Sequence, residues 1–120
     1  MNKISDSELE VMKILWEKGA VTSPEIIEKL TQKIDWSKTT IKTLITRLVN
    51  KGAIEQIKNE GKLYTYKALI SEKEYKKEEN NNFITKLYKG SVNNMLLNFV
   101  EEKQISKEDL EKLLAIIEED

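Results

Sequence analysis

Residues 36–52 read WSKTTIKTLITRLVNKG, and this stretch decides the predicted fold. Ser37 is a good N-cap and Gly52 a good helix terminator, so the stretch predicts one continuous helix. Four apolar residues recur in it at helical spacing: Ile41, Leu44, Ile45 and Leu48. One side of this helix is therefore expected to be buried.

The opposite side of the same helix is polar. It is centred on Thr39, Thr43, Thr46 and Asn50, with Thr40, Lys42 and Arg47 at its flanks. Threonine is a mediocre helix former, so several threonines on an exposed face indicate a purpose other than stability. Their hydroxyl and methyl groups suit base edges, phosphates or thymine methyls, and an arginine fork suits guanine or phosphate. The residues of this helix predicted to contact DNA are Ser37, Lys38, Thr39, Thr40, Lys42, Thr43, Thr46 and Arg47. An ordinary solvated helix face is the alternative.

Charge is distributed unevenly along the chain, although the net charge is only −1. Residues 1–70 hold 12 Lys and Arg against 9 Asp and Glu, a net +3. Residues 71–120 hold 8 against 12, a net −4. No acid occurs between Trp36 and Ile54. Such a local basic stretch is typical of phosphate contact, with a chance cluster of surface lysines as the alternative.

Two further helices are expected before residue 36. The first covers residues 6–18, where Ser5 and Glu8 match a capping box. The second begins at Thr22, with Pro24 suited to its first turn. Both carry apolar residues at helical spacing, so both are expected to pack against the helix of residues 36–52.

After Gly52 the periodicity changes from helix to strand. Residues 53–58 and 63–68 are rich in Ile, Tyr and Thr and predict two short strands joined as a hairpin. Three helices followed by a hairpin form a winged helix-turn-helix, so residues 1–70 are predicted to be a DNA-binding domain. At the tip of the hairpin, Lys58 and Lys62 are predicted to add DNA backbone contacts.

Residues 71–120 are predicted to be a helical dimerisation region. The charged segment 71–82 is expected to be helical, with fraying near residues 80–82; a linker is the alternative. Apolar stripes then recur on short amphipathic segments, and the predicted interface residues are Phe83, Leu87, Leu96, Phe99, Leu110, Leu113, Leu114 and Ile117. Such thin helices cannot bury these stripes among themselves, so a second copy of the chain is the expected partner. Packing of the stripes on the first 70 residues is the alternative.

The composition argues against several other functions. The chain contains no Cys and no His, and its four glycines are isolated. Zinc sites, Ser–His or Cys–His catalytic groups and Gly-rich phosphate loops are therefore not expected, nor are a cofactor or enzymatic activity. The apolar runs are short and no signal-peptide pattern opens the sequence, so a cytoplasmic location is expected.

Several stretches resemble one known family. Residues 35–48 and 51–52 resemble the recognition segment of the penicillinase and methicillin-resistance repressors, the BlaI/MecI family. Residues 10–16 resemble the first helix of that family, and residues 83–90 and 96–101 resemble its tail. The resemblance implies a mainly α-helical, homodimeric repressor of β-lactam-resistance genes that binds an inverted-repeat operator. A winged-helix regulator of another regulon and a protein-interaction module remain the alternatives.

The resemblance also implies how such a repressor is inactivated. In that family a membrane sensor-protease pathway responds to the antibiotic, and the repressor is cut at an Asn–Phe bond. The matching bond here is Asn98–Phe99. Loss of the chain beyond the cut is expected to weaken dimerisation, and with it the joint binding of two half-sites. On the residues alone, Asn98 is a surface position and Phe99 belongs to an apolar face.

Overall fold

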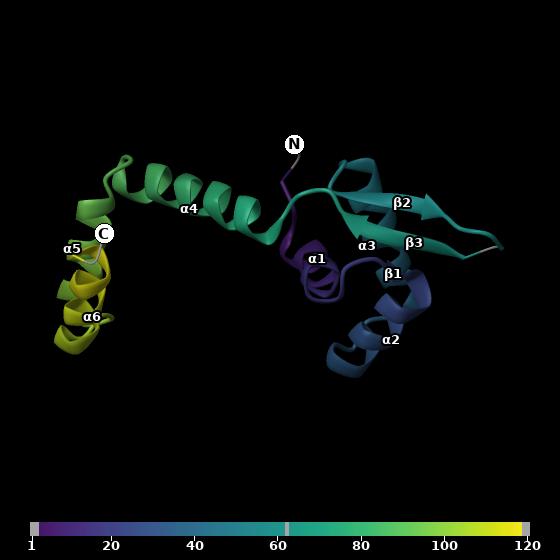
Figure 1. Cartoon of the computed structure of the whole chain (residues 1–120), viewed down its shortest axis with the longest axis horizontal. Coiled ribbons are helices and arrows are strands. Elements are labelled where there is room, and N and C mark those ends of the chain that lie inside the picture. The colour runs from purple at the N-terminus through teal and green to yellow at the C-terminus, as the bar shows by residue number, and fades with distance from the viewer. Residues whose placement is uncertain (1–2, 62, 119–120) are drawn as a thin grey trace. The chain divides into compact units, whose positions relative to one another are not determined.

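The computed structural model describes residues 3–61 and 63–118, and side chains as far as residue 115. Its elements in chain order are α1 (Asp6–Lys18), β1 (Val21–Thr22), α2 (Ser23–Lys33), α3 (Lys38–Asn50), β2 (Ile54–Lys58), β3 (Tyr64–Ala68), α4 (Glu72–Tyr88), α5 (Val92–Glu101) and α6 (Lys107–Glu118) (Figure 1). The chain divides into two compact units, of which the first ends at Tyr75 and the second begins at Lys76. No helix in the described part of the chain is long and apolar enough to cross a membrane.

The first three helices begin where their caps predict. The Ser5 hydroxyl accepts a hydrogen bond from the Glu8 backbone, and the Glu8 carboxylate accepts one from the Ser5 backbone. Thr22 and Glu25 form the same reciprocal pair at the start of α2. Ser37 caps α3. Because each cap pairs amide groups that the first turn leaves free, the three helix starts are fixed by local sequence.

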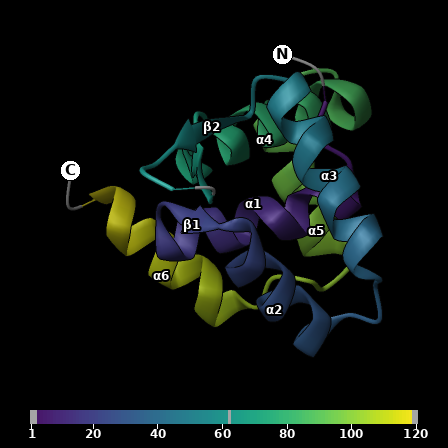
Figure 2. The ribbon, with the colours of Figure 1, turned by 90° about the vertical axis from the view of Figure 1, so that its right-hand side faces the viewer.

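The three helices bury their apolar sides against one another and against the small sheet. The buried core consists of Ile4, Val11, Met12, Leu15, Val21, Ile26, Leu30, Ile41, Leu44, Ile45, Leu48, Ala53, Ile54 and Tyr66. The buried stripe predicted for α3 is therefore confirmed. Trp36 packs against this core at the entry to α3. In Figure 2, α3 lies at the edge of the unit, so that one of its sides faces outward.

The sheet has three antiparallel strands in the order β1-β3-β2. Strands β2 and β3 form the predicted hairpin, with Ile54 opposite Ala68 and Lys58 opposite Tyr64. We call this hairpin, with its connecting residues, the wing. Strand β1 was not predicted, because two residues are too few to show a period of two. The order of three helices and a wing confirms the predicted winged helix-turn-helix.

The first unit extends past residue 70, and Trp16 makes two contacts with this added segment. Its indole nitrogen donates a hydrogen bond of 2.9 Å to the carbonyl of Ile70. Its ring also packs against Tyr75, with the ring centroids 5.4 Å apart. These contacts tie the first turn of α4 to α1, so the boundary lies inside a helix rather than in a linker.

The second unit consists of the rest of α4 together with α5 and α6. The expected fraying near residues 80–82 was wrong, since α4 is helical without interruption through these positions. Three asparagines lower helix propensity by only about half a kcal/mol each, too little to stop a helix that continues on both sides. None of the described side chains between residues 76 and 115 is buried. Helices α4 and α5 meet at Tyr88, whose ring packs edge-on to Phe99 and whose hydroxyl donates to Asn98.

Candidate nucleic-acid interface

The outer side of α3 carries the side chains that the sequence analysis selected. We define the recognition face as Thr39, Lys42, Thr43, Thr46, Arg47 and Asn50, all of which are exposed. Ser37, Lys38 and Thr40 at the start of the helix are exposed as well. Lys58 is exposed at the end of β2, and Lys62 lies outside the described residues. The helix thus separates a buried apolar side from an exposed polar one.

The hydroxyl groups on α3 are held in defined positions. The Ser37 hydroxyl accepts a hydrogen bond of 3.1 Å from the Thr40 backbone and lies 3.0 Å from the Thr40 hydroxyl. Thr43 donates to the carbonyl of Thr39 at 3.0 Å, and Thr46 donates to the carbonyl of Lys42 at the same distance. Hydroxyls that bond back to the helix in this way have restricted rotamers, so the face is preorganised.

The cations of α3 are available to an outside partner. Lys38, Lys42 and Arg47 are exposed, and none forms an ion pair with a described residue. Because no acid occurs between residues 36 and 54, nothing on α3 neutralises them. An unpaired positive field of this kind attracts phosphates, and the arginine fork is suited to bidentate contacts.

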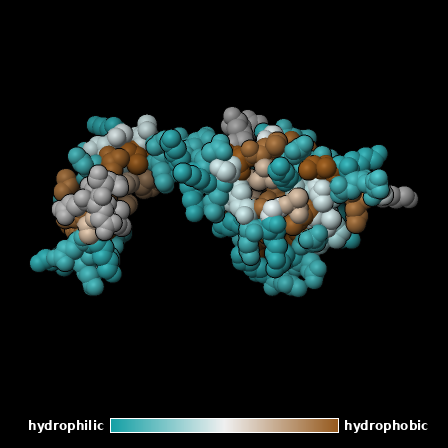
Figure 3. Space-filling model, in the orientation of Figure 1, coloured by the Kyte–Doolittle hydropathy of each residue, from teal (hydrophilic) through white to brown (hydrophobic). Residues whose placement is uncertain are grey.

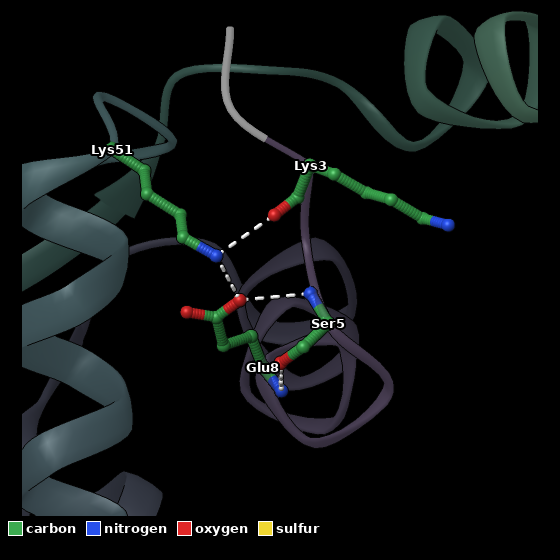
Figure 4. Close-up of polar contacts among 4 residues, drawn as sticks. All are labelled: Lys3, Ser5, Glu8 and Lys51. Carbon is green, nitrogen blue, oxygen red and sulfur yellow. Dashed lines mark hydrogen bonds and ion pairs between the residues drawn. The ribbon is translucent and has the colours of Figure 1, made fainter.

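Lys51, at the C-cap of α3, differs from these three cations because it is paired within the fold. Its ammonium donates to the Glu8 carboxylate at 2.5 Å and to the Lys3 carbonyl at 2.8 Å (Figure 4). Glu8 is 1% exposed, and its Oε2 has no hydrogen-bond partner among the described residues. Burial raises the pKa of Glu8, but the hydrogen bonds from Lys51 and Ser5 and the charge of Lys51 together outweigh burial and lower this pKa. The charge of Lys51 thus stabilises the contact between α3 and α1.

A depression lies beside the start of α3. It has a volume of about 460 Å³ and is lined by residues of α2, α3 and the wing: Ser23, Pro24, Ile27, Glu28, Lys38, Lys42, Leu63, Tyr64 and Tyr66. Leu63 and Tyr64 are exposed, so the wing presents apolar side chains next to the two lysines. Leu63 and Tyr64 were not predicted to lie beside α3, because strand alternation does not show which exposed side chains approach another element. Asn59 bonds to Thr65 within the wing.

The fold therefore defines the class of this protein, a winged helix-turn-helix protein with an appended helical unit. The profile of the penicillinase repressor family matches residues 4–119. The penicillinase repressor of Bacillus licheniformis is 39% identical over 117 residues, which cover 98% of this chain and 91% of that protein. The methicillin resistance regulatory protein MecI of Mammaliicoccus sciuri is 43% identical over 115 residues, covering 96% and 93%. The chain belongs to the penicillinase repressor family, which confirms the resemblance found in the sequence.

Two solved structures are similar to the first unit. The solution structure of the DNA-binding domain of the repressor BlaI matches with a TM-score of 0.55 and 40% identity, covering 62% of this chain and 94% of that domain. The solution structure of monomeric Bacillus licheniformis BlaI in complex with the blaP half-operator matches with a TM-score of 0.54 and 39% identity, covering 62% and 89%. Both matches confirm the predicted winged-helix fold. The two relatives given above are by name a repressor and a regulatory protein.

Proposed function

We propose that this repressor-family protein binds an inverted-repeat operator of β-lactam-resistance genes as a homodimer, with each recognition face in a major groove. The observation that carries the proposal is the construction of α3, an acid-free exposed face over a fully buried apolar stripe. Winged helices present such a helix to base edges. The complex of the similar BlaI with a half-operator supports DNA as the partner. No catalytic residue is needed, and a cytoplasmic location fits this role.

The proposal divides the contacts by chemistry. The threonines and Arg47 are assigned to base edges, because they lie on the exposed side of α3 opposite the buried stripe, the side that a recognition helix turns into the major groove. Lys38 and Lys42 flank this region and are assigned to phosphates. Lys58, at the end of β2, is assigned to the DNA backbone beside the wing. The phosphate contacts supply affinity and the base contacts supply sequence preference.

The second unit is assigned to dimerisation because its apolar side chains lack a core. Phe83, Leu87, Leu96, Leu113 and Leu114 are each between 37% and 57% exposed, and Phe99 and Leu110 are half-buried. The side chain of Ile117 lies outside the described residues. Figure 3 shows hydrophobic side chains at the surface of this unit. Helices without a buried core are stabilised by a partner, and a second copy supplies the same stripes.

Cleavage between Asn98 and Phe99 is proposed as the inactivating step, downstream of a membrane sensor-protease. The bond lies inside α5, and Tyr88 contacts the residues on both sides of it. After β-lactam treatment of cells that hold the sensor gene, mass spectrometry should detect a fragment ending at Asn98. An intact repressor, or a fragment ending at another residue, would show that the proposed bond is wrong.

Selection from a pool of random DNA duplexes tests the proposed operator. The purified full-length chain is the bait, and the recovered duplexes are sequenced. Two copies of one half-site in inverted orientation are expected, with centres separated by about 10 base pairs or a multiple of that spacing. Recovered duplexes without a shared motif would overturn the proposal.

A further inference from the structure

Two threonines of the recognition face donate their hydroxyl protons to backbone carbonyls of α3. Thr43 donates to the carbonyl of Thr39 and Thr46 to the carbonyl of Lys42, each at 3.0 Å. A carbonyl oxygen only accepts, so the hydroxyl must be the donor in both bonds. Each exposed side chain therefore has a methyl group and an oxygen lone pair left for a partner.

The other threonines of α3 are in different situations. The hydroxyl of Thr40 lies 3.0 Å from that of Ser37, within the cap. Thr39 stands in the first turn, where the residue four positions before it lies outside the helix. Its side chain forms no hydrogen bond within the described part of the chain, so its proton remains available. The threonines of α3 look alike in the sequence. In the structure, Thr43 and Thr46 differ from the others because their hydroxyls donate hydrogen bonds to backbone carbonyls of the helix.

We infer that Thr43 and Thr46 read DNA through their methyl groups, and that their partner is the C5 methyl of thymine. This inference rests on the proposed entry of α3 into the major groove. Among base edges in that groove, the thymine methyl is the apolar group, and threonine methyls are among its usual contacts. The hydrogen bonds to the helix turn the hydroxyls along the backbone, so contact between methyls removes apolar surface from water without breaking a hydrogen bond.

Paired substitutions separate the methyl from the hydroxyl. Thr43→Val and Thr46→Val keep the methyl and remove the hydroxyl, whereas Thr43→Ser and Thr46→Ser do the reverse. Thr31 provides a matched control, since it is exposed on α2 and its hydroxyl also bonds back, to the carbonyl of Glu28. Thr31→Ser and Thr31→Val should leave the dissociation constant unchanged. Thermal unfolding of each full-length variant verifies the fold.

The DNA probe is a duplex selected from a random pool by the wild-type protein, together with copies in which single thymines are replaced by uracil. Each threonine is expected to contact one thymine per half-site. At fixed salt, replacement of a single such thymine by uracil should weaken binding of the duplex about fourfold, the factor that burial of one methyl group gives. The Val variants should bind as the wild type does. Because both protomers carry the substitution, each Ser variant should bind about sixteenfold more weakly, and it should no longer distinguish uracil from thymine at that position.

Two results would overturn the inference while leaving the proposed function in place. The first is sequence-specific binding that no uracil replacement weakens. The second is loss of binding in the Val variants with normal binding in the Ser variants, which would assign recognition to the hydroxyl oxygens. Failure to select any sequence would instead overturn the proposed function, and the inference with it.

Discussion

The ammonium of Lys51 lies 2.5 Å from the carboxylate of Glu8, so an ion pair joins the C-cap of α3 to the first turn of α1 (Figure 4). The two residues are 43 positions apart in sequence. The pair holds one end of α3 in place, while the caps and the buried stripe hold the rest. The position of the recognition face thus depends on a contact that lies outside that face.

The Glu8→Gln substitution should destabilise the first unit. The variant keeps an acceptor for the Ser5 backbone but leaves Lys51 without its counter-charge, and a hydrogen bond to a charged group contributes about 1.5–3 kcal/mol. Urea unfolding followed by tryptophan fluorescence measures the loss, because Trp16 and Trp36, the two tryptophans of the chain, both lie in this unit. Glu10→Gln is the control, since its pairs with Lys13 and Lys33 are more exposed and worth at most about 1 kcal/mol. Equal losses in the two variants would contradict the assigned role of Glu8.

The ion pair of Glu8 and Lys51 makes the free energy of unfolding depend on pH in the acidic range. The pKa of Glu8 in the folded chain lies below its ordinary value of 4.5, so its stabilising contribution is complete above that pH. The contribution is lost as the pH falls through the lowered, folded-state pKa. The difference in unfolding free energy between wild type and Glu8→Gln should therefore be constant near neutral pH and shrink in strongly acidic buffer. A difference that grows as the pH falls would have the wrong sign.

Replacement of Arg47 by alanine should weaken operator binding without loss of stability. Arg47 is exposed and unpaired within the described residues, and an arginine that binds a base bidentately contributes about 1–3 kcal/mol. Fluorescence anisotropy with the selected duplex, at one salt concentration, measures the change. Lys18→Ala, which removes a cation from the end of α1, should have little effect. Normal binding by the Arg47 variant would remove this residue from the recognition face.

The Leu113→Asp substitution should convert the proposed dimer to a monomer. Leu113 is 46% exposed within one chain, and a carboxylate in an apolar interface loses its hydration without compensation. Sedimentation velocity at micromolar concentration distinguishes the two states, and Glu111→Gln on the same helix should remain dimeric. A Leu113→Asp protein that is still a dimer would exclude α6 from the interface.

The local part of this structure was predictable from the sequence. Caps such as Ser5 and Ser37 fix where helices begin, and apolar spacing identified the buried side of α3. These features depend on residues three or four positions apart, so a single sequence contains them. The helix over residues 71–82 was predicted, but the fraying expected near residues 80–82 was wrong, because the helix on both sides outweighs the weak helix propensity of the three asparagines.

Contacts between distant segments were not predictable. The sequence indicated Glu8 as a cap but gave no sign of its pairing with Lys51. Lys51 also lies in the basic stretch identified from the sequence, although in the structure its charge is paired with the carboxylate of Glu8. The hydroxyl directions of Thr43 and Thr46 were open as well, since threonine in a helix has two accessible rotamers. The three-dimensional structure is needed to show which backbone carbonyl each hydroxyl contacts.

Titration of the full-length protein against three duplexes tests the central claim most directly. The duplexes carry the selected inverted repeat, one half-site of it, or a scrambled sequence, and each is measured at two salt concentrations. We predict that the inverted repeat binds about 10²–10⁴ times more tightly than the half-site, since the second contact becomes intramolecular. Affinity should also fall steeply with salt because phosphate contacts release counterions. Equal affinity for all three duplexes, or no binding at low salt, would contradict the account of a dimeric operator-binding repressor.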